Sequence, residues 1–294
     1  MENINQFYLI NKKNKKINIL EGKRIKDFKC ILLHIHGIGS HFQKKDYQDK
    51  EDEFIHFDKL DDYFNKFGFI NYALEFEGHG KSDGERCLVN DINDLVNDIV
   101  VTIDFIKVLY DKKIFIIAES MGGNVAIRYC LKEKIDGLIL LSPMCGIDKN
   151  LIPNCLIRNI LIPLSYLFPN HPLINKNSNS QIYNINYNEA KNNCKYNYKD
   201  LIKLGTAREC LNATINLMEL SRNFDTPILG FHDKDDNITN AEITENFFIN
   251  CKSKDKTFIM IENSHHCLLI KRDDNKNNPL DIMNRIVIWL NDRI

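Results

Sequence analysis

A disulfide framework is missing from this sequence. Its nine cysteines are an odd number, and they form neither C-x-x-C pairs nor the Cys/His spacing of a metal site. Scattered cysteines of this kind are typical of proteins kept in a reducing compartment. The cysteines therefore exclude a small disulfide-stapled fold and predict a cytoplasmic protein.

Long apolar runs are also missing. The N-terminal stretch MENINQFYLINKKNKKINIL has no continuous apolar core of the kind that a signal peptide needs. No other stretch is long enough to cross a bilayer as a helix. We therefore expect neither secretion nor a membrane span. Peripheral contact with a membrane would leave no motif in the sequence, and this alternative stays open.

Excess charge of one sign and the common cofactor motifs are absent as well. The chain has 39 basic and 40 acidic residues, so it has no overall field that would attract nucleic acid. The stretch HGIGSH (36–41) lacks the G-x-G-x-x-G spacing of dinucleotide sites, and no histidine belongs to an H-E-x-x-H motif. We expect no nucleic-acid partner, no cofactor and no metal. Nothing in the sequence predicts the oligomeric state.

Buried strands alternate with helices along most of the chain. Short apolar runs bounded by turn residues predict the strands, which are CILLHI (30–35), FINYALE (69–75), IFIIA (114–118), GLILLS (137–142), TPILGFH (226–232) and TFIMI (257–261). Over 91–110, apolar residues recur at the spacing of one helix face. This alternation predicts an α/β protein with a mostly parallel sheet, helices on both faces, and a single domain over 1–294.

The alternation is interrupted between residues 146 and 207. Residues 151–174 are apolar and contain four of the seven prolines, and an Asn- and Tyr-rich stretch follows. We expect an inserted cap, or lid, over 146–207. Apolar residues recur at helical spacing over 152–168, and Pro163 should divide this segment into two short helical pieces. Such pieces could line an acyl tunnel, rest on a lipid surface, or simply pack on the core.

The stretch ESMGG (119–123) joins a predicted strand directly to a predicted helix. A serine at the apex of such a sharp turn holds its hydroxyl away from the backbone, and small neighbours let the two elements pass closely. Ser120 is therefore a candidate nucleophile, although Ser and Gly are also ordinary turn residues. Because a lone hydroxyl is not nucleophilic, the hypothesis needs a base and an orienting acid elsewhere.

Two further predicted strands are followed by the residue types that a serine nucleophile needs. TPILGFH is followed by DKDDNIT (233–239), and TFIMI by ENSHHCLL (262–269). Loops after the carboxyl ends of parallel strands meet at one edge of a sheet. The candidate acids are Asp233, Asp235 and Asp236, and the candidate bases are His265 and His266. The chain order Ser, Asp, His is the one that α/β-hydrolases use.

Three stretches support a more specific assignment. HIHGIGSH (34–41), EFEGHGKSDG (75–84) and ESMGG (119–123) resemble motifs of the monoacylglycerol lipase and lysophospholipase group of serine α/β-hydrolases. Ala118 stands where that group usually has glycine, and Glu75 where it usually has aspartate. The resemblance implies an α/β-hydrolase fold with an inserted cap.

The resemblance also selects among the candidate acids and bases. It implies that Asp236 is the acid and that Asp233 and Asp235 are solvated loop charges. It implies that His266 is the base, because Leu268 then completes the group's His-x-Leu pattern, and His265 is the weaker candidate.

The expected chemistry follows from these assignments. The backbone N–H groups of Ile38 and Met121 should form the oxyanion hole for the tetrahedral intermediate. The implied activity is hydrolysis of monoacyl lipid esters such as monoacylglycerol through an acyl-enzyme on Ser120. A lysophospholipase or a broad-specificity esterase is the nearest alternative. The alternative of another class is a non-catalytic binding protein that retains a hydrolase fold.

Overall fold

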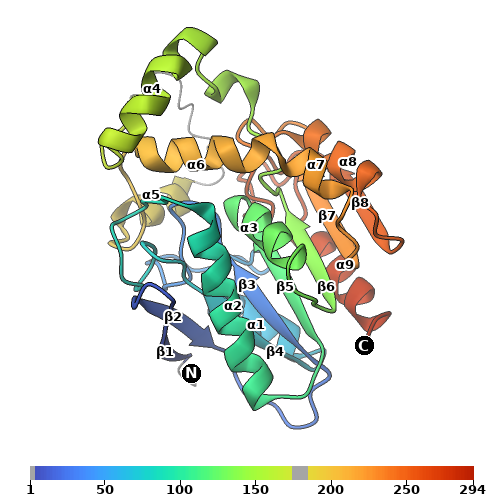
Figure 1. The fold of residues 1–294 in the computed structure, drawn as a ribbon. Coiled ribbons are helices and arrows are strands. Elements are labelled where there is room, and N and C mark those ends of the chain that lie inside the picture. The colour runs from blue at the N-terminus through green and yellow to red at the C-terminus, as the bar shows by residue number, and fades with distance from the viewer. Residues whose placement is uncertain (1–3, 174–184) are drawn as a thin grey trace.

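A mostly parallel sheet forms the centre of the protein in a computed structural model that describes residues 4–173 and 185–294 (Figure 1). The strands are ordered β1-β2-β4-β3-β5-β6-β7-β8. Their bounds are Asn5–Ile10, Lys16–Glu21, Cys30–Ile35, Phe69–Leu74, Ile114–Glu119, Gly137–Leu141, Ile228–Asp233 and Lys256–Ile261 for β1 to β8. β2 pairs antiparallel with β1 and β4, and the neighbours from β4 to β8 pair parallel. The predicted sheet is confirmed.

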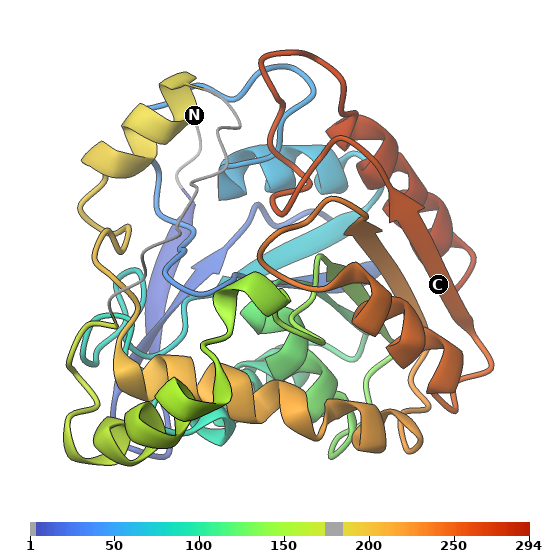
Figure 2. The ribbon, with the colours of Figure 1, turned by 90° about the horizontal axis from the view of Figure 1, so that it is seen from above.

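Helices cover both faces of this sheet. Helices α1 (Phe57–Asn65) and α9 (Pro279–Asn291) lie on one face, and α2 (Ile92–Leu109), α3 (Met121–Cys130) and α8 (Ala241–Asn250) lie on the other (Figure 2). Each face carries its own apolar core cluster. The central strands are apolar on both sides for this reason, and all six residues of β3 are buried.

The helix predicted over 91–110 is α2. The Asp91 side chain caps it by accepting a hydrogen bond from the Asn93 amide. Its apolar stripe is buried against the sheet, as the spacing indicated, and includes Ile92, Leu95, Val96, Ile99, Ile103 and Ile106. Helix α2 packs beside α3, so it supports the helix that begins directly after Ser120.

The chain between β6 and β7 forms a layer above the carboxyl ends of the strands (Figure 1). Its described elements are the 3-10 helix η1 (Lys149–Leu151), α4 (Cys155–Leu167), α5 (Ile185–Asn193), α6 (Leu204–Ile215) and α7 (Leu217–Ser221). The boundaries of a cap over 146–207 stay a prediction. Helix α6 crosses the predicted end at residue 207, and 174–184 lie outside the described residues.

The expectation that Pro163 divides the segment 152–168 into two pieces is wrong. Helix α4 is continuous and contains Pro163 in its interior. Contacts with α6 hold the turn that the proline would otherwise break. The Arg208 guanidinium donates to the Ser165 carbonyl oxygen at 3.1 Å and lies 4.1 Å from the centre of the Tyr166 ring. Tertiary contacts thus outweigh the loss of one helical hydrogen bond.

Candidate active site

The turn between β5 and α3 holds Ser120 in a strained backbone conformation. Ser120 has φ 54° and ψ −122°, and residues with a side chain rarely adopt such a positive φ. Its amide donates to the Leu141 carbonyl oxygen on β6 at 3.1 Å, which ties the turn to the sheet. Only glycine fits at position 122, because a Cβ there would lie 2.5 Å from the His36 carbonyl oxygen. The structure therefore has the predicted sharp turn, with strain of the kind found at functional serines.

The three loops that follow β5, β7 and β8 bring Ser120, Asp236 and His266 together. His266 Nε2 lies 2.9 Å from Ser120 Oγ, and His266 Nδ1 lies 2.7 Å from Asp236 Oδ2. Since a carboxylate only accepts, Nδ1 carries the proton and Nε2 is left to accept from the serine hydroxyl. The sequence-predicted acid, base and nucleophile thus form one hydrogen-bonded chain.

Asp236 is held by donors that the sequence analysis did not single out. Its Oδ2 also accepts from Thr239 Oγ1 at 2.8 Å and from His232 Nε2 at 3.1 Å. Its Oδ1 accepts from the amides of Ile238 at 2.8 Å and Thr239 at 3.1 Å. The sequence signal for His232 was its place at the end of the apolar run TPILGFH. A histidine in a buried strand needs a hydrogen-bond partner. These donors fix the carboxylate that faces His266.

Asp233 is not the solvated loop charge that the sequence analysis expected. Its side chain is buried at the end of β7 and accepts from the amides of Ser264, His265 and Asp235. It thereby holds the start of the loop that carries His266. Asp235 is exposed, as expected. The sequence could not separate the two, because a buried carboxylate bonded only to backbone amides leaves no pattern in side-chain types.

Charge and burial act in opposite directions on this site. Burial lowers the pKa of His266, but the charge and hydrogen bond of Asp236, together with the charge of Glu119, raise it above its ordinary value. Burial raises the pKa of Asp236, but His266 and His232 outweigh that and hold it well below its ordinary range. Asp236 therefore stays ionised, and the imidazolium of His266 is stabilised.

Two backbone amides are available beside the Ser120 hydroxyl. Within 4–173 and 185–294, no group accepts the N–H of Ile38 or of Met121. Met121 directly follows Ser120 at the N-terminus of α3, where amides lack intrahelical partners. The loop before Ile38 lies against the serine, because a Cβ on Gly37 would be 2.9 Å from Ser120 Cβ. Both amides are therefore candidate oxyanion donors, as the sequence analysis expected.

Glu75 anchors the loop that carries Ile38. Its buried carboxylate accepts from the Phe42 amide at 2.9 Å, from the Gln43 side chain at 3.0 Å and from the Lys81 amide at 2.8 Å. Glu75, which stands where the group usually has aspartate, therefore supports the loop of the site and is not one of the reacting groups.

Ser120 lies where two cavities meet. One, of about 200 Å³, is lined mainly by apolar side chains of the segment between β6 and β7, among them Met144, Ile147, Leu161, Ile162, Leu204 and Leu211. The other, of about 1260 Å³, is also lined by polar and charged side chains, among them His41, Lys45, Glu119, Tyr187, Asn188 and Lys191. The nucleophile can therefore be reached by an apolar group from one side and by a polar group from the other.

Comparison with known proteins finds a matching family and several similar chains. The family described as serine aminopeptidase, S33, matches residues 28–273. A monoglyceride lipase of Mus musculus is 24% identical over 274 residues, which cover 90% of this chain and 84% of that protein. A putative monoglyceride lipase of Schizosaccharomyces pombe is 28% identical over 184 residues, and the match covers 60% of this chain and 47% of that protein. A soluble variant of monoglyceride lipase from Saccharomyces cerevisiae, solved in complex with a substrate analog, has a TM-score of 0.78 at 18% identity and covers 100% of this chain and 96% of that one.

Proposed function

Since this chain belongs to the serine aminopeptidase S33 family of α/β-hydrolases, we propose that it cleaves the carboxylic ester of monoacylglycerols through an acyl-enzyme. The family and the relatives make the protein a serine hydrolase. The substrate and the roles of single residues are our proposal, which the names of the relatives and the geometry of the site support.

The proposed reaction uses the hydrogen-bonded chain around Ser120. The Ser120 oxygen attacks the ester carbonyl while His266 Nε2 takes its proton, and Asp236 stabilises the imidazolium that forms. The amides of Ile38 and Met121 donate to the oxyanion of the tetrahedral intermediate. His266 then protonates the departing alcohol, and a water molecule, activated by the same histidine, releases the fatty acid from the serine.

The position of Ser120 between the two cavities carries the substrate proposal. A single acyl chain suits the cavity under α4 and α6, because apolar side chains form most of its lining. The alcohol part of the ester then lies in the wider cavity, whose polar side chains suit hydroxyl groups. This division favours an ester with one long acyl chain and one polar alcohol, such as a monoacylglycerol.

A hydrolysis panel tests this proposal. We expect the wild-type protein to release fatty acid from a long-chain monoacylglycerol with a higher kcat/KM than from a short soluble ester. Labelling of Ser120 by a fluorophosphonate is the second measurement, because only an activated serine reacts. Equal rates on both esters would favour a broad esterase, and an unlabelled Ser120 would favour a non-catalytic binding protein.

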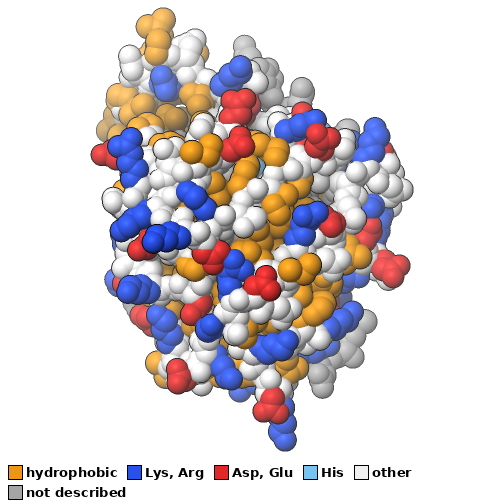
Figure 3. Space-filling view, turned by 90° about the vertical axis from the view of Figure 1, so that its right-hand side faces the viewer, with side chains coloured by type: hydrophobic (Ala, Val, Ile, Leu, Met, Phe, Trp, Pro, Cys, Tyr) orange, Lys and Arg blue, Asp and Glu red, His pale blue; other side chains and the backbone are white. Residues whose placement is uncertain are grey.

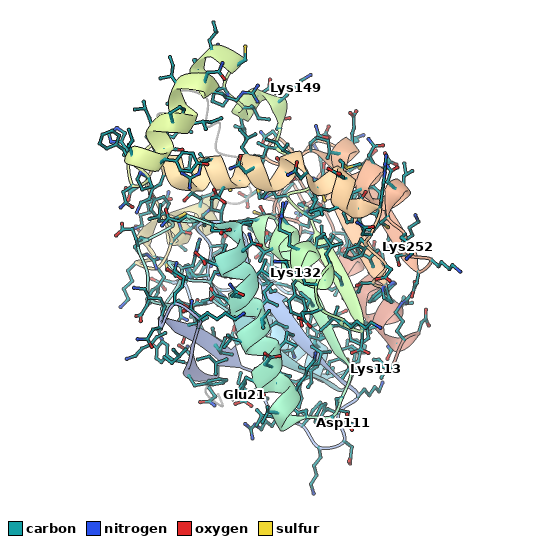
Figure 4. The ribbon with its side chains drawn as sticks, viewed as in Figure 1. Glu21, Asp111, Lys113, Lys132, Lys149 and Lys252 are labelled. Atoms are coloured by element: carbon teal, nitrogen blue, oxygen red, sulfur yellow. The ribbon has the colours of Figure 1, made fainter. Side chains whose placement is uncertain are left out.

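We also propose that α4 contacts a lipid surface. Within the described ranges, no helix is both long and apolar enough to cross a membrane. Helix α4 nevertheless has outward-facing apolar side chains, with Leu156 74%, Ile160 64% and Leu167 72% exposed. Helix α4 lies at the top of the molecule (Figure 1), where hydrophobic side chains gather on the surface (Figure 3), and Lys149 lies close by on η1 (Figure 4). An exposed apolar helix beside a basic residue suits the surface of a membrane that contains the substrate.

A further inference from the structure

Strand β8 forms one edge of the sheet, since it stands last in the strand order, beside β7. The Lys234 amide donates to the Ile261 carbonyl oxygen at 3.1 Å, so the odd-numbered residues of β8 bond to β7. Because bonding directions alternate along a strand, Phe258 and Met260 present their amide and carbonyl groups outwards. Among the residues that the structure describes, no backbone group bonds to them on that side. Such an edge is a template for pairing with another strand.

Apolar side chains lie on both sides of this edge. Strand β8 and helices α8 and α9 lie on the right-hand side of the molecule in Figure 1, and hydrophobic side chains gather along the middle of that side in Figure 3. Met260 on β8 is 38% exposed, Ile249 on α8 is 65% exposed and Ile288 on α9 is 62% exposed. Helices α8 and α9 cover opposite faces of the sheet, so both faces contribute apolar surface beside the edge. A surface of this kind favours contact with another protein.

The two ends of the edge carry opposite charges. Lys256 begins β8, and Glu262 directly follows its last residue. Lys256 Nζ donates to the carbonyl oxygens of Ile249 and Cys251 at the end of α8, which leaves one of its three N–H donors. The Glu262 side chain is 62% exposed and pairs with Lys234 through one oxygen. Each charged group can therefore take a further partner of opposite charge.

Antiparallel pairing of two copies of β8 brings these charges together. When Ile259 of one copy lies opposite Ile259 of the other, Phe258 lies opposite Met260, and Lys256 lies opposite Glu262. In this register the outward groups of the even-numbered residues face each other, as an antiparallel ladder requires. The two-fold axis repeats the Lys–Glu pair at the other end of the ladder. The edge is thus complementary to itself in both backbone groups and charge.

We propose that two copies of this chain form a symmetric dimer through β8, with Ile259 on the two-fold axis and an ion pair between Lys256 and Glu262 at each end. Backbone hydrogen bonds then join the two sheets, and α8 and α9 of one copy lie beside their counterparts in the other. The same patch is used on both copies, so the contact closes on itself and covers the edge without forming a filament. This proposal does not depend on the proposed ester hydrolase function.

Charge reversal tests this register. Sedimentation velocity of the full chain should give twice the mass of one chain for the wild-type protein at micromolar concentration. Glu262→Lys places two ammonium groups opposite each other at both ends of the ladder, and Lys256→Glu places two carboxylates there. Each variant alone should raise the dissociation constant of the dimer by about tenfold or more, as expected for close charge pairs across an interface. Mixed in equal amounts, the two variants restore a Lys–Glu pair at both ends and should form a heterodimer.

Two measurements separate association from folding. Lys256→Glu also removes the donor at the end of α8, so a thermal melt accompanies each sample. A variant that fails to fold cannot restore the dimer in the mixture. Met260→Pro removes one outward amide and keeps the bonds between β7 and β8, a position at which edge strands tolerate proline. It should abolish the dimer while the protein stays folded.

The matched control is Asp62→Lys. The Asp62 side chain is 55% exposed and pairs with Lys23, so it resembles Glu262 in exposure and pairing, but it lies on α1, which packs on β4. Its substitution should leave the dimer intact. A wild-type protein that stays monomeric at every concentration would overturn the proposal, as would a mixture of the two charge variants that stays monomeric. Charge variants that each remain dimeric would overturn it as well.

Discussion

His266 Nε2 lies 2.9 Å from Ser120 Oγ, although the two residues are 146 positions apart in the chain. Two different loops carry them, one after β5 and one after β8, and the sheet brings the carboxyl ends of these strands to the same edge. This contact converts an ordinary hydroxyl into a candidate nucleophile, and the predictions below depend on it.

Ser120→Ala should lower ester hydrolysis by about 10³-fold or more while the fold is retained, because the change removes one hydroxyl from the reacting chain. Enzyme kinetics and a thermal melt would measure the two effects. Ser142→Ala is the matched control, since Ser142 is also buried and also has a positive φ, of 42°, but its hydroxyl has no hydrogen-bond partner among the described residues. Near-normal turnover in Ser120→Ala would end the serine mechanism.

His266→Ala should cause a loss on the order of 10³-fold in kcat, because the base is removed. His265→Ala should cause a far smaller loss, since the contact of His265 with Asp233 uses its backbone amide, which the substitution keeps. Kinetics of the two variants side by side would measure this. The reverse ranking would move the base by one position.

The pH dependence of kcat/KM should have an acidic limb above the ordinary histidine value. His266 acts as a base only when neutral, and Asp236 and Glu119 raise its pKa, so activity falls as the pH drops through that raised value. Glu119→Gln removes one of the two negative charges and should move the limb to lower pH. Glu262→Gln, on an exposed residue paired with Lys234, is the control and should leave the limb in place. A limb that moves to higher pH in Glu119→Gln would contradict the assignment.

His232→Phe should lower kcat by about tenfold, because Asp236 loses one of its side-chain donors while the ring volume is kept. The carboxylate then keeps Thr239, His266 and the backbone amides of Ile238 and Thr239 as donors. If His232 only fills the core, the substitution should change stability but not the pKa of His266. The pH profile of kcat should therefore be measured together with a thermal melt. A variant that is less stable but fully active would assign His232 to the core alone.

Replacing Leu156, Ile160 and Leu167 together by Ser should weaken binding to lipid vesicles by at least about tenfold, since each buried methylene contributes roughly 0.8 kcal/mol. Hydrolysis of a dissolved short-chain ester should stay near the wild-type rate. Vesicle sedimentation and an esterase assay would measure the two effects. Leu161→Ser is the control on the other face of α4, because Leu161 lines the apolar cavity. This variant should depress long-chain hydrolysis without a change in vesicle binding. Unchanged sedimentation of the triple variant would contradict the lipid contact.

The predictions made from the apolar stripe over 152–168 show where sequence periodicity stops being informative. The spacing indicated one stripe, but Leu161 lines the apolar cavity, whereas Leu156 and Ile160 face outwards. Periodicity predicts which residues share a helix face, but the partner that covers this face is decided by tertiary packing. For the same reason α4 continues through Pro163, where α6 supports it.

The sequence by itself determined the strands, the turn at Ser120 and the order of the three site residues. These features are local, since an apolar run rich in isoleucine such as residues 114–118 has to be buried, and a serine between such a strand and a helix has to occupy a sharp turn. Only the tertiary structure decided how Asp233 differs from Asp236, which the family resemblance had already indicated as the acid. Asp233 ends β7 and Asp236 follows it, and both are buried, yet Asp233 accepts from backbone amides, whereas Asp236 accepts from His266 as well as from backbone amides. That difference depends on how the loop after β8 folds over the end of β7, and contacts between segments so far apart in the chain are not encoded in the spacing of either one.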